Sequence, residues 1–227
     1  MYDYSRNAEL VGYPSDSTTA ERPAVLSAVL GLLGFASLFT AGGALIAPIL
    51  GPSAVLISIV GSLATLLGLF VARDKAPLNL ALLYAFATFE GLALGLILDL
   101  YVTNGLGRVV LDATLTTAVV TLVAGAYGYT TNRNVSGIGG ILTVGLIGVL
   151  IASIVGVFVE LPLLQIGISA VAAVLFTGFL VYDLNRVAQN RGATEGEIVL
   201  LAVSIYLDIF NLFLALLQLF GLPGRDE

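Results

Sequence analysis

The sequence predicts an all-α integral membrane protein with seven transmembrane helices, and three observations support this fold class. Of the 227 residues, 58% are hydrophobic and only 11% are charged, whereas a soluble domain is about 45–50% apolar and about 25% charged. The apolar residues form long runs, and a membrane-spanning helix needs about 20 such residues. Seven such runs take up most of the chain, so no room remains for a separate soluble domain.

The first three predicted spans are bounded by polar residues, proline and glycine. The first, 24–47, follows Arg22-Pro23, and the second, 53–72, follows Gly51-Pro52. The third, 77–101, begins with a proline, a residue well suited to the first turn of a helix. Its glycines Gly91 and Gly95 are four residues apart, a spacing that lets helix backbones approach closely in lipid.

The last four spans follow the same logic and complete the predicted domain. The fifth carries another stripe of small residues, Gly148, Ala152 and Gly156, for which we also expect close packing. The four ranges are 109–129, 138–159, a sixth span between the break at 160–162 and about Asn185, and 197–221. The predicted organisation is a polar tail (1–23), a seven-helix transmembrane domain (24–222) and a short C-terminal tail (223–227).

The basic residues predict how the chain is oriented in a cell membrane. Cytoplasmic loops carry an excess of Lys and Arg. With seven spans, seven basic residues fall on one side and two on the other, so we expect a multi-pass protein with a cytoplasmic N-terminus and an external C-terminus. The side with seven holds Arg6, Arg22, Arg73, Lys75, Arg133, Arg186 and Arg191, and the other holds Arg108 and Arg225.

The composition also limits the possible chemistry. The chain has no histidine and no cysteine, which removes disulfides, Ser–His and Cys–His catalysis, and the usual ligands of zinc, copper, haem and iron–sulfur clusters. A net charge of −6 disfavours nucleic acid as a partner. The remaining carboxylates and hydroxyls suit protons or a hard cation such as Ca²⁺, and no resident cofactor is expected.

Asp208 is the clearest candidate for a functional residue. It lies about eleven residues into the last span, or about 16 Å along the helix, near the bilayer centre, where an ionisable side chain costs about 2.5–3.5 kcal/mol. Ser204 and Asn211 share its helix face. We expect this polar seam to face the bundle interior and to line a path. A seam of hydrogen bonds between helices, without transport, is the alternative.

Asp183 is the second candidate, at the inner end of the sixth span, where an ordinary solvated helix end is the alternative. In an antiparallel hairpin of the last two spans it lies on the same half of the membrane as Asp208. Two carboxylates in a low-dielectric site do not both ionise at low cost, so such a pair shares a proton. Arg73, on the same membrane side, is a candidate counter-ion, although the positive-inside rule also accounts for it. Glu90 is a further pore-lining candidate whose orientation the sequence leaves open.

Several segments resemble the Bax inhibitor-1 (transmembrane Bax inhibitor motif) family. The strongest are VYDLNRV (181–187) and IYLDIFNLFLALLQLFG (205–221), supported by FEGLALG (89–95) and YGYTTNRNVSGIGG (127–140). The resemblance implies a fold in which the last helix is central and six helices surround it. It also implies a function, because prokaryotic members are regarded as pH-sensitive calcium leak channels.

The resemblance assigns roles to three residues. The aspartates that match Asp183 and Asp208 act as the proton sensor, and the arginine that matches Arg73 latches onto the one that matches Asp183. We therefore expect a calcium leak gated by this pair rather than an enzyme, with lipid, protons and Ca²⁺ as its partners and both carboxylates as Ca²⁺ ligands.

Two other functions remain as alternatives. An intramembrane aspartyl protease also places aspartates in two late spans, but Ile205-Tyr206-Leu207 precedes Asp208 here instead of Gly-x-Gly. A membrane interaction protein without transport is the second alternative. A retinal protein is excluded, because the only lysine, Lys75, lies in a loop.

Overall fold

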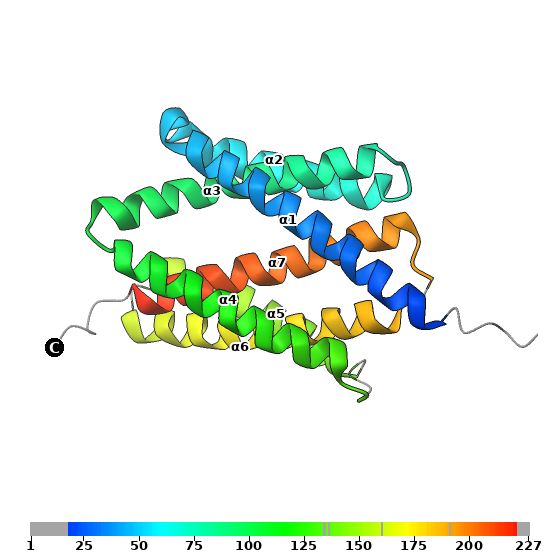
Figure 1. Cartoon of the computed structure of the whole chain (residues 1–227). Helices are drawn as coiled ribbons and strands as arrows, with labels where there is room; N and C mark the ends of the chain where they lie inside the picture. The colour runs from blue at the N-terminus through cyan, green and yellow to red at the C-terminus, as the bar shows by residue number, and fades with distance from the viewer. Residues whose placement is uncertain (1–17, 134, 136, 160, 191, 222–227) are drawn as a thin grey trace, which may run out of the picture.

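The computed structural model describes residues 18–133, 135, 137–159, 161–190 and 192–221, and its regular structure in these segments is seven α-helices (Figure 1). All seven are long and apolar enough to cross a membrane, which confirms the predicted fold class. The helices are α1 (Thr18–Leu50), α2 (Ser53–Ala72), α3 (Leu78–Thr103), α4 (Gly107–Thr130), α5 (Ile138–Phe158), α6 (Pro162–Gln189) and α7 (Glu195–Phe220).

Helix α7 lies in the middle of the bundle, with α1, α2 and α3 on one side and α4, α5 and α6 on the other (Figure 1). Its most apolar stretch is 56% buried, whereas the corresponding stretches of the other six helices are 11–33% buried. The central position implied for the last helix is therefore confirmed. The six others do not surround it evenly, since α5 packs chiefly against α6 at the edge of the bundle.

Small residues decide where the helices approach most closely. A Cβ atom at Gly91 or Gly95 of α3 would collide with the carbonyl oxygen of Thr40 or Ala44 in α1, so close packing at this pair is confirmed. In α5 the prediction of close packing at small residues holds at one glycine and fails at another. Gly156 faces Ile168 of α6, but a Cβ at Gly148 would meet nothing within 4 Å. The prediction is wrong for Gly148, because only one edge of α5 has a neighbouring helix.

Polar contacts define the start of α7 and join α6 to α7 near the far end of the hairpin. At the start of α7, the Thr194 backbone N–H donates to Glu197 Oε2 (2.8 Å) and the Glu197 backbone N–H donates to Thr194 Oγ1 (3.3 Å), which is a capping box. Near the far end, Ser169 Oγ of α6 donates to Gln218 Oε1 of α7 (2.8 Å). The capping box fixes where α7 begins, and the Ser169–Gln218 bond links the two helices that carry the aspartates.

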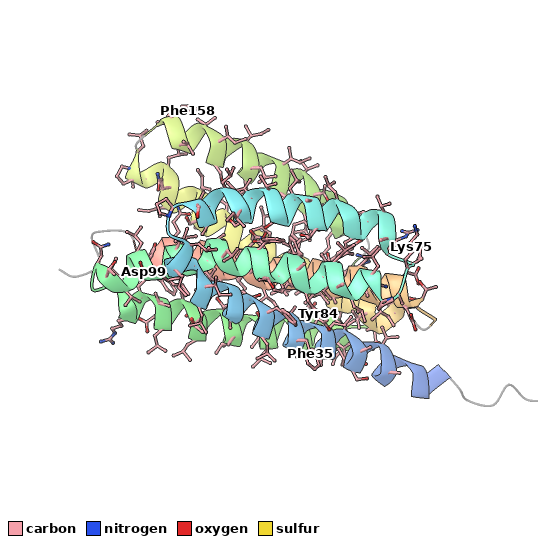
Figure 2. The ribbon with its side chains drawn as sticks, turned by 90° about the horizontal axis from the view of Figure 1, so that it is seen from above. Phe35, Lys75, Tyr84, Asp99 and Phe158 are labelled. Atoms are coloured by element: carbon pink, nitrogen blue, oxygen red, sulfur yellow. The ribbon has the colours of Figure 1, made fainter. Side chains whose placement is uncertain are left out.

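The described connections define the two ends of the bundle. Lys75, between α2 and α3, lies at the opposite end from Asp99 of α3 and Phe158 of α5 (Figure 2). The Lys75 end is the predicted cytoplasmic side. Helix α1 begins at Thr18, so the last residues of the predicted tail are helical. Residues 1–17 and 222–227, and with them Arg6 and Arg225, lie outside the described residues.

Candidate functional site

The two predicted aspartates meet inside the membrane domain. Asp183 of α6 and Asp208 of α7 lie side by side, with their carboxyl groups within hydrogen-bonding reach of each other. Their side chains are almost fully enclosed, with relative exposures of 2% and 6%. The hairpin of the last two helices thus produces the contact that the sequence predicts. The roles given to the pair remain predictions.

The partners of the two carboxyl groups differ. Asp183 Oδ1 accepts a hydrogen bond from Arg186 Nη1 (3.1 Å), and its Oδ2 accepts one from the Ser204 hydroxyl. Asp208 Oδ2 is buried and accepts no hydrogen bond from any described residue. A neighbouring cation and a hydroxyl donor favour the charged form of a carboxyl group. The two carboxyl groups therefore differ in their donors, since Asp183 has one on each oxygen and Asp208 Oδ2 has none among the described residues.

Arg73 does not contact Asp183. Its Nε forms an ion pair with Asp74 Oδ2 (3.2 Å), and its side chain is 55% exposed. The counter-ion of Asp183 is instead Arg186, three residues further along the same helix. The signal for this contact was in the sequence, since residues three apart share a helix face. The positive-inside rule also accounts for Arg186, so the sequence alone does not mark it as a site residue.

A cavity of about 420 Å³ is lined by both Arg186 and Ser204, the two residues that hydrogen-bond to Asp183. It lies between α2, α6 and α7, and Leu66, Phe70 and Leu207 contribute to its apolar wall. Its polar lining consists of Arg73, Arg186, Asn190, Glu197 and Ser204. Arg73 and Arg186 thus face the same space even though they bind different carboxylates. Neither aspartate lines this inner cavity, and its connection to the pair is through Arg186 and Ser204.

The three predicted pore-lining residues lie in different places. Ser204 belongs to the site through its hydrogen bond to Asp183. Asn211 donates its side-chain amide to the carbonyl oxygen of Leu207 in its own helix (2.8 Å). Half-buried Glu90 of α3 is hydrogen-bonded to Ser62 of α2 and lies near Tyr206. Tyr206 is about 200° around α7 from Asp208, so the structure does not bring Glu90 to the pair.

A second, larger cavity lies on the side of α7 that carries Tyr206. It has a volume of about 580 Å³ and is enclosed by α1, α3, α4 and α7. Leucine, isoleucine, valine and phenylalanine side chains form much of its wall, and its polar side chains bear hydroxyl groups. One of these, Tyr206 Oη, is 2.8 Å from Thr40 Oγ1. With no carboxylate in its lining, this cavity offers a poor environment for a cation.

The amide in the Tyr-Asp-Leu-Asn segment has a structural role. Asn185 of α6 is 2% exposed and donates to the carbonyl oxygen of Gly128 in α4 (3.0 Å), while its Oδ1 accepts from Gln189 Nε2 (2.5 Å). Gly128 in turn lies against the backbone of Val181, where a Cβ atom would collide. These contacts hold α6 against α4 close to Asp183.

The pair provides two of the oxygen-bearing groups that Ca²⁺ requires. Calcium takes about 6–8 oxygen ligands, and among the described residues no group of three or more Asp or Glu side chains is placed to hold a metal ion. A Ca²⁺ ion at Asp183 and Asp208 would complete its shell with hydroxyl or carbonyl oxygens and water. Such a ligand set suits an ion in transit better than one tightly held.

Comparisons with known proteins agree on one family. The family model described as "Inhibitor of apoptosis-promoting Bax1", of the Bax inhibitor-1 family, matches residues 22–225. The modulator of FtsH protease YccA from Escherichia coli is 31% identical over 172 residues, which cover 73% of this chain and 77% of that protein. A Golgi anti-apoptotic protein from vaccinia virus is 33% identical over 174 residues, covering 77% of this chain and 71% of the viral one.

Proposed function

This chain belongs to the Bax inhibitor-1 family, and from that premise we propose that it is a calcium-permeable leak of the membrane, gated by protonation of Asp183 and Asp208. The observation that carries the proposal is the contact between two enclosed carboxyl groups from neighbouring transmembrane helices. Ionisable groups inside a membrane domain are costly, and they typically mark ion or proton pathways.

The gate follows from the electrostatics of the pair. With one shared proton, a hydrogen bond between the carboxyl groups joins α6 to α7, and the oxygens are occupied. Loss of that proton places two negative charges side by side in a low-dielectric site, where they repel strongly. The side chains then separate and their oxygens become available to a divalent cation. The leak is therefore closed at acidic pH and opens as pH rises.

The surroundings of the pair are consistent with a path that begins at the inner cavity. Arg186 and Ser204 line that cavity, and both hydrogen-bond to Asp183. On the far side of the pair, Gln165, Ser169 and Gln218 continue the polar contacts between α6 and α7. We propose that in the protonated state the aspartate contact closes this seam, and that separation of the side chains connects its two halves.

Calcium flux into proteoliposomes tests the proposal. Wild type should conduct little at about pH 6 and more at about pH 8, because in the proposed gate loss of the shared proton separates the two carboxyl groups. Asp183→Asn and Asp208→Asn should each remove this pH dependence. Asp112→Asn is the matched control, because Asp112 pairs with Arg108 at 3.9 Å and both side chains are exposed. An Asp208→Asn variant with the flux and pH response of wild type would refute the gate.

A second candidate function comes from the E. coli relative, whose name describes a modulator of the FtsH protease. Under this alternative the chain binds a membrane protease and conducts no ions. The two functions separate in one preparation, because the leak requires no second protein. Purified protein without ion flux that changes the activity of added FtsH would favour the modulator.

The protease alternative has its own test. The names of the two relatives describe a modulator and an anti-apoptotic protein rather than an enzyme. An intramembrane aspartyl protease would cleave a model transmembrane peptide and lose that activity on Asp208→Asn. We expect no cleavage by wild type.

We also propose the orientation of the chain in the membrane. Of the basic residues with described side chains, Arg73, Lys75, Arg133 and Arg186 belong to one end of the bundle and Arg108 to the other. By the positive-inside rule the first end is cytoplasmic. A single cysteine at Lys75 should then be protected from an impermeant thiol reagent in intact cells, and one at Arg108 should react.

A further inference from the structure

We infer that Arg186 is a tethered counter-ion of Asp183, which holds that carboxylate in position and which an incoming divalent cation must displace. This inference deepens the proposed function and rests on it for the role of the cation. It assigns to Arg186 the position that the family resemblance gives to Arg73. Arg186 is therefore a positioning residue whose substitution should change how the pair titrates.

Geometry favours Arg186 over Arg73. Arg186 Nη1 lies 3.1 Å from Asp183 Oδ1, and its guanidinium carbon lies 5.7 Å from the centre of the Tyr182 ring on the same helix. The contact needs no movement of another helix. Arg73 follows the end of α2 and is paired with Asp74. For Arg73 to reach Asp183 it would have to leave that partner and displace Arg186.

The two side chains of this ion pair differ in exposure, and the difference indicates that an incoming cation competes with Arg186 for Asp183. The Arg186 side chain is 53% exposed, whereas that of Asp183 is 2% exposed. An ion arriving through the inner cavity therefore meets the guanidinium before the carboxylate. Because Oδ1 accepts from Arg186 and Oδ2 accepts from Ser204, a Ca²⁺ ion that binds Asp183 comes close to the guanidinium, and repulsion between the two cations favours the departure of Arg186. Arg186 can swing into the cavity that it lines.

The other charged groups around Asp183 are few. Helix α7 presents Asp208 and Glu197, and Arg73 at the end of α2 faces the inner cavity. Glu197 is engaged by the Thr194 backbone in the capping box, and Arg73 by Asp74. On its own helix Asp183 has Arg186, with Tyr182 beside it. Arg186 is thus the cation that acts on the pair most directly.

Charge alone gives the direction in which loss of Arg186 should move the pH midpoint of calcium flux. Removing the positive charge beside Asp183 makes it harder to take the shared proton away, so the pair keeps its proton to higher pH. An adjacent arginine lowers the pKa of a carboxyl group by about 1–3. Because Arg186 is half exposed, we expect Arg186→Gln to move the midpoint of calcium flux upward by about one unit, at the lower end of that range.

Two comparisons make the flux test specific. Arg186→Lys keeps the charge and should restore most of the wild-type midpoint. Arg73→Gln should move the midpoint less than Arg186→Gln, and Arg108→Gln, at an exposed ion pair on the opposite side, should leave it unchanged. A shift for Arg73→Gln that equals or exceeds the one for Arg186→Gln would overturn the inference, and so would a lack of rescue by lysine.

A second readout does not depend on transport. Infrared titration of the purified protein in lipid nanodiscs follows the C=O band of a protonated carboxyl group, which Asp208→Asn identifies by removing it. We expect the pH at which this band disappears to rise in Arg186→Gln. If the band shifts but wild type conducts no Ca²⁺ at any pH, the proposed function fails and the counter-ion role stands. An unshifted band contradicts the counter-ion role whether or not the protein conducts.

A double variant covers the possibility that Arg186→Gln fails to fold because it leaves a buried carboxylate without its partner. Asp183→Asn combined with Arg186→Gln removes both charges of the ion pair and should fold. In the Asp183→Asn background, Arg186→Gln should have no further effect on the Asp208 band. A shift that persists in that background would show that Arg186 acts on Asp208 without Asp183, against the inference.

Discussion

Two faces of α7 show how one central helix serves two environments. The face toward α6 carries Ser204 and Asp208, and its polar groups meet partners directly. The opposite face carries Tyr206 and Phe210, which line the larger cavity among α1, α3 and α4. The smaller, polar side has the better chemistry for an ion. Cavity size alone would have pointed to the wrong face.

The difference follows from solvation. In hydrocarbon an ion needs oxygen ligands at each step of its path, because no water replaces the shell that it loses. The α6 face provides carboxylates, hydroxyls and amides, while the opposite cavity provides hydroxyls and no carboxylate. Thr40 and Thr117 of that cavity donate to carbonyl oxygens of their own helices. The first face suits ion passage and the second suits packing against apolar groups.

The largest effect on the pH response of the flux should come from a substitution that forces α6 away from α4. Gly128→Val places a branched side chain against the backbone of Val181, and overpacking of this kind costs about 1–3 kcal/mol. Asp183 lies two residues beyond Val181, so the pH response of the flux should be lost together with thermal stability. Gly148→Val is the matched control, since a Cβ there meets nothing within 4 Å. Equal losses in both variants would contradict this account of α6 packing.

A smaller effect is expected from Ser204→Ala, which removes one donor to Asp183 and little volume. Hydrogen bonds between transmembrane helices are worth about 1–2 kcal/mol in model peptides and about 0.6 kcal/mol on average in a folded membrane protein. Loss of this donor destabilises the charged form of Asp183, so the pair keeps its proton to higher pH. The flux midpoint should move upward by less than in Arg186→Gln. A downward shift would mean that the hydroxyl stabilises the protonated state instead.

The smallest effect on the pH midpoint of the flux should come from a substitution on the apolar face of α7. Tyr206→Phe removes the hydroxyl that lies 2.8 Å from Thr40 Oγ1, at a cost to thermal stability of about 1 kcal/mol or less. Tyr206 turns away from Asp208, so the pH midpoint of the flux should stay at its wild-type value. Flux measured across the same pH series checks this. A shift as large as that of Ser204→Ala would mean that the two faces of α7 are coupled.

The sequence predicts the spans and the aspartate pair because both depend on features that a linear chain displays. Long apolar runs locate the helices, and an antiparallel hairpin is enough to bring Asp183 and Asp208 to the same depth. The start of α7 at Glu195 differs by only two residues from the predicted start at 197. Such differences do not change which residues meet.

The rotation of each helix about its axis was not predictable in the same way. Lipid and the protein interior are both apolar, so a span has no strong polar face that marks its outside. For this reason the sequence left the orientation of Glu90 open, and in the structure Glu90 bonds to Ser62 of α2. Asn211 bonds to the Leu207 carbonyl oxygen of its own helix, and its place at the path stays a prediction. Arg73 could not be assigned because its partner depends on where α2 ends, and the chain leaves α2 at Ala72, next to Asp74.

The central claim is that one proton, shared by Asp183 and Asp208, closes the leak. The most direct test records the carboxyl C=O band and Ca²⁺ flux on the same proteoliposomes along one pH titration. In wild type the band should disappear over the pH range in which flux rises, and Asp208→Asn should abolish both transitions. Flux that rises with pH while the band stays constant would contradict the claim.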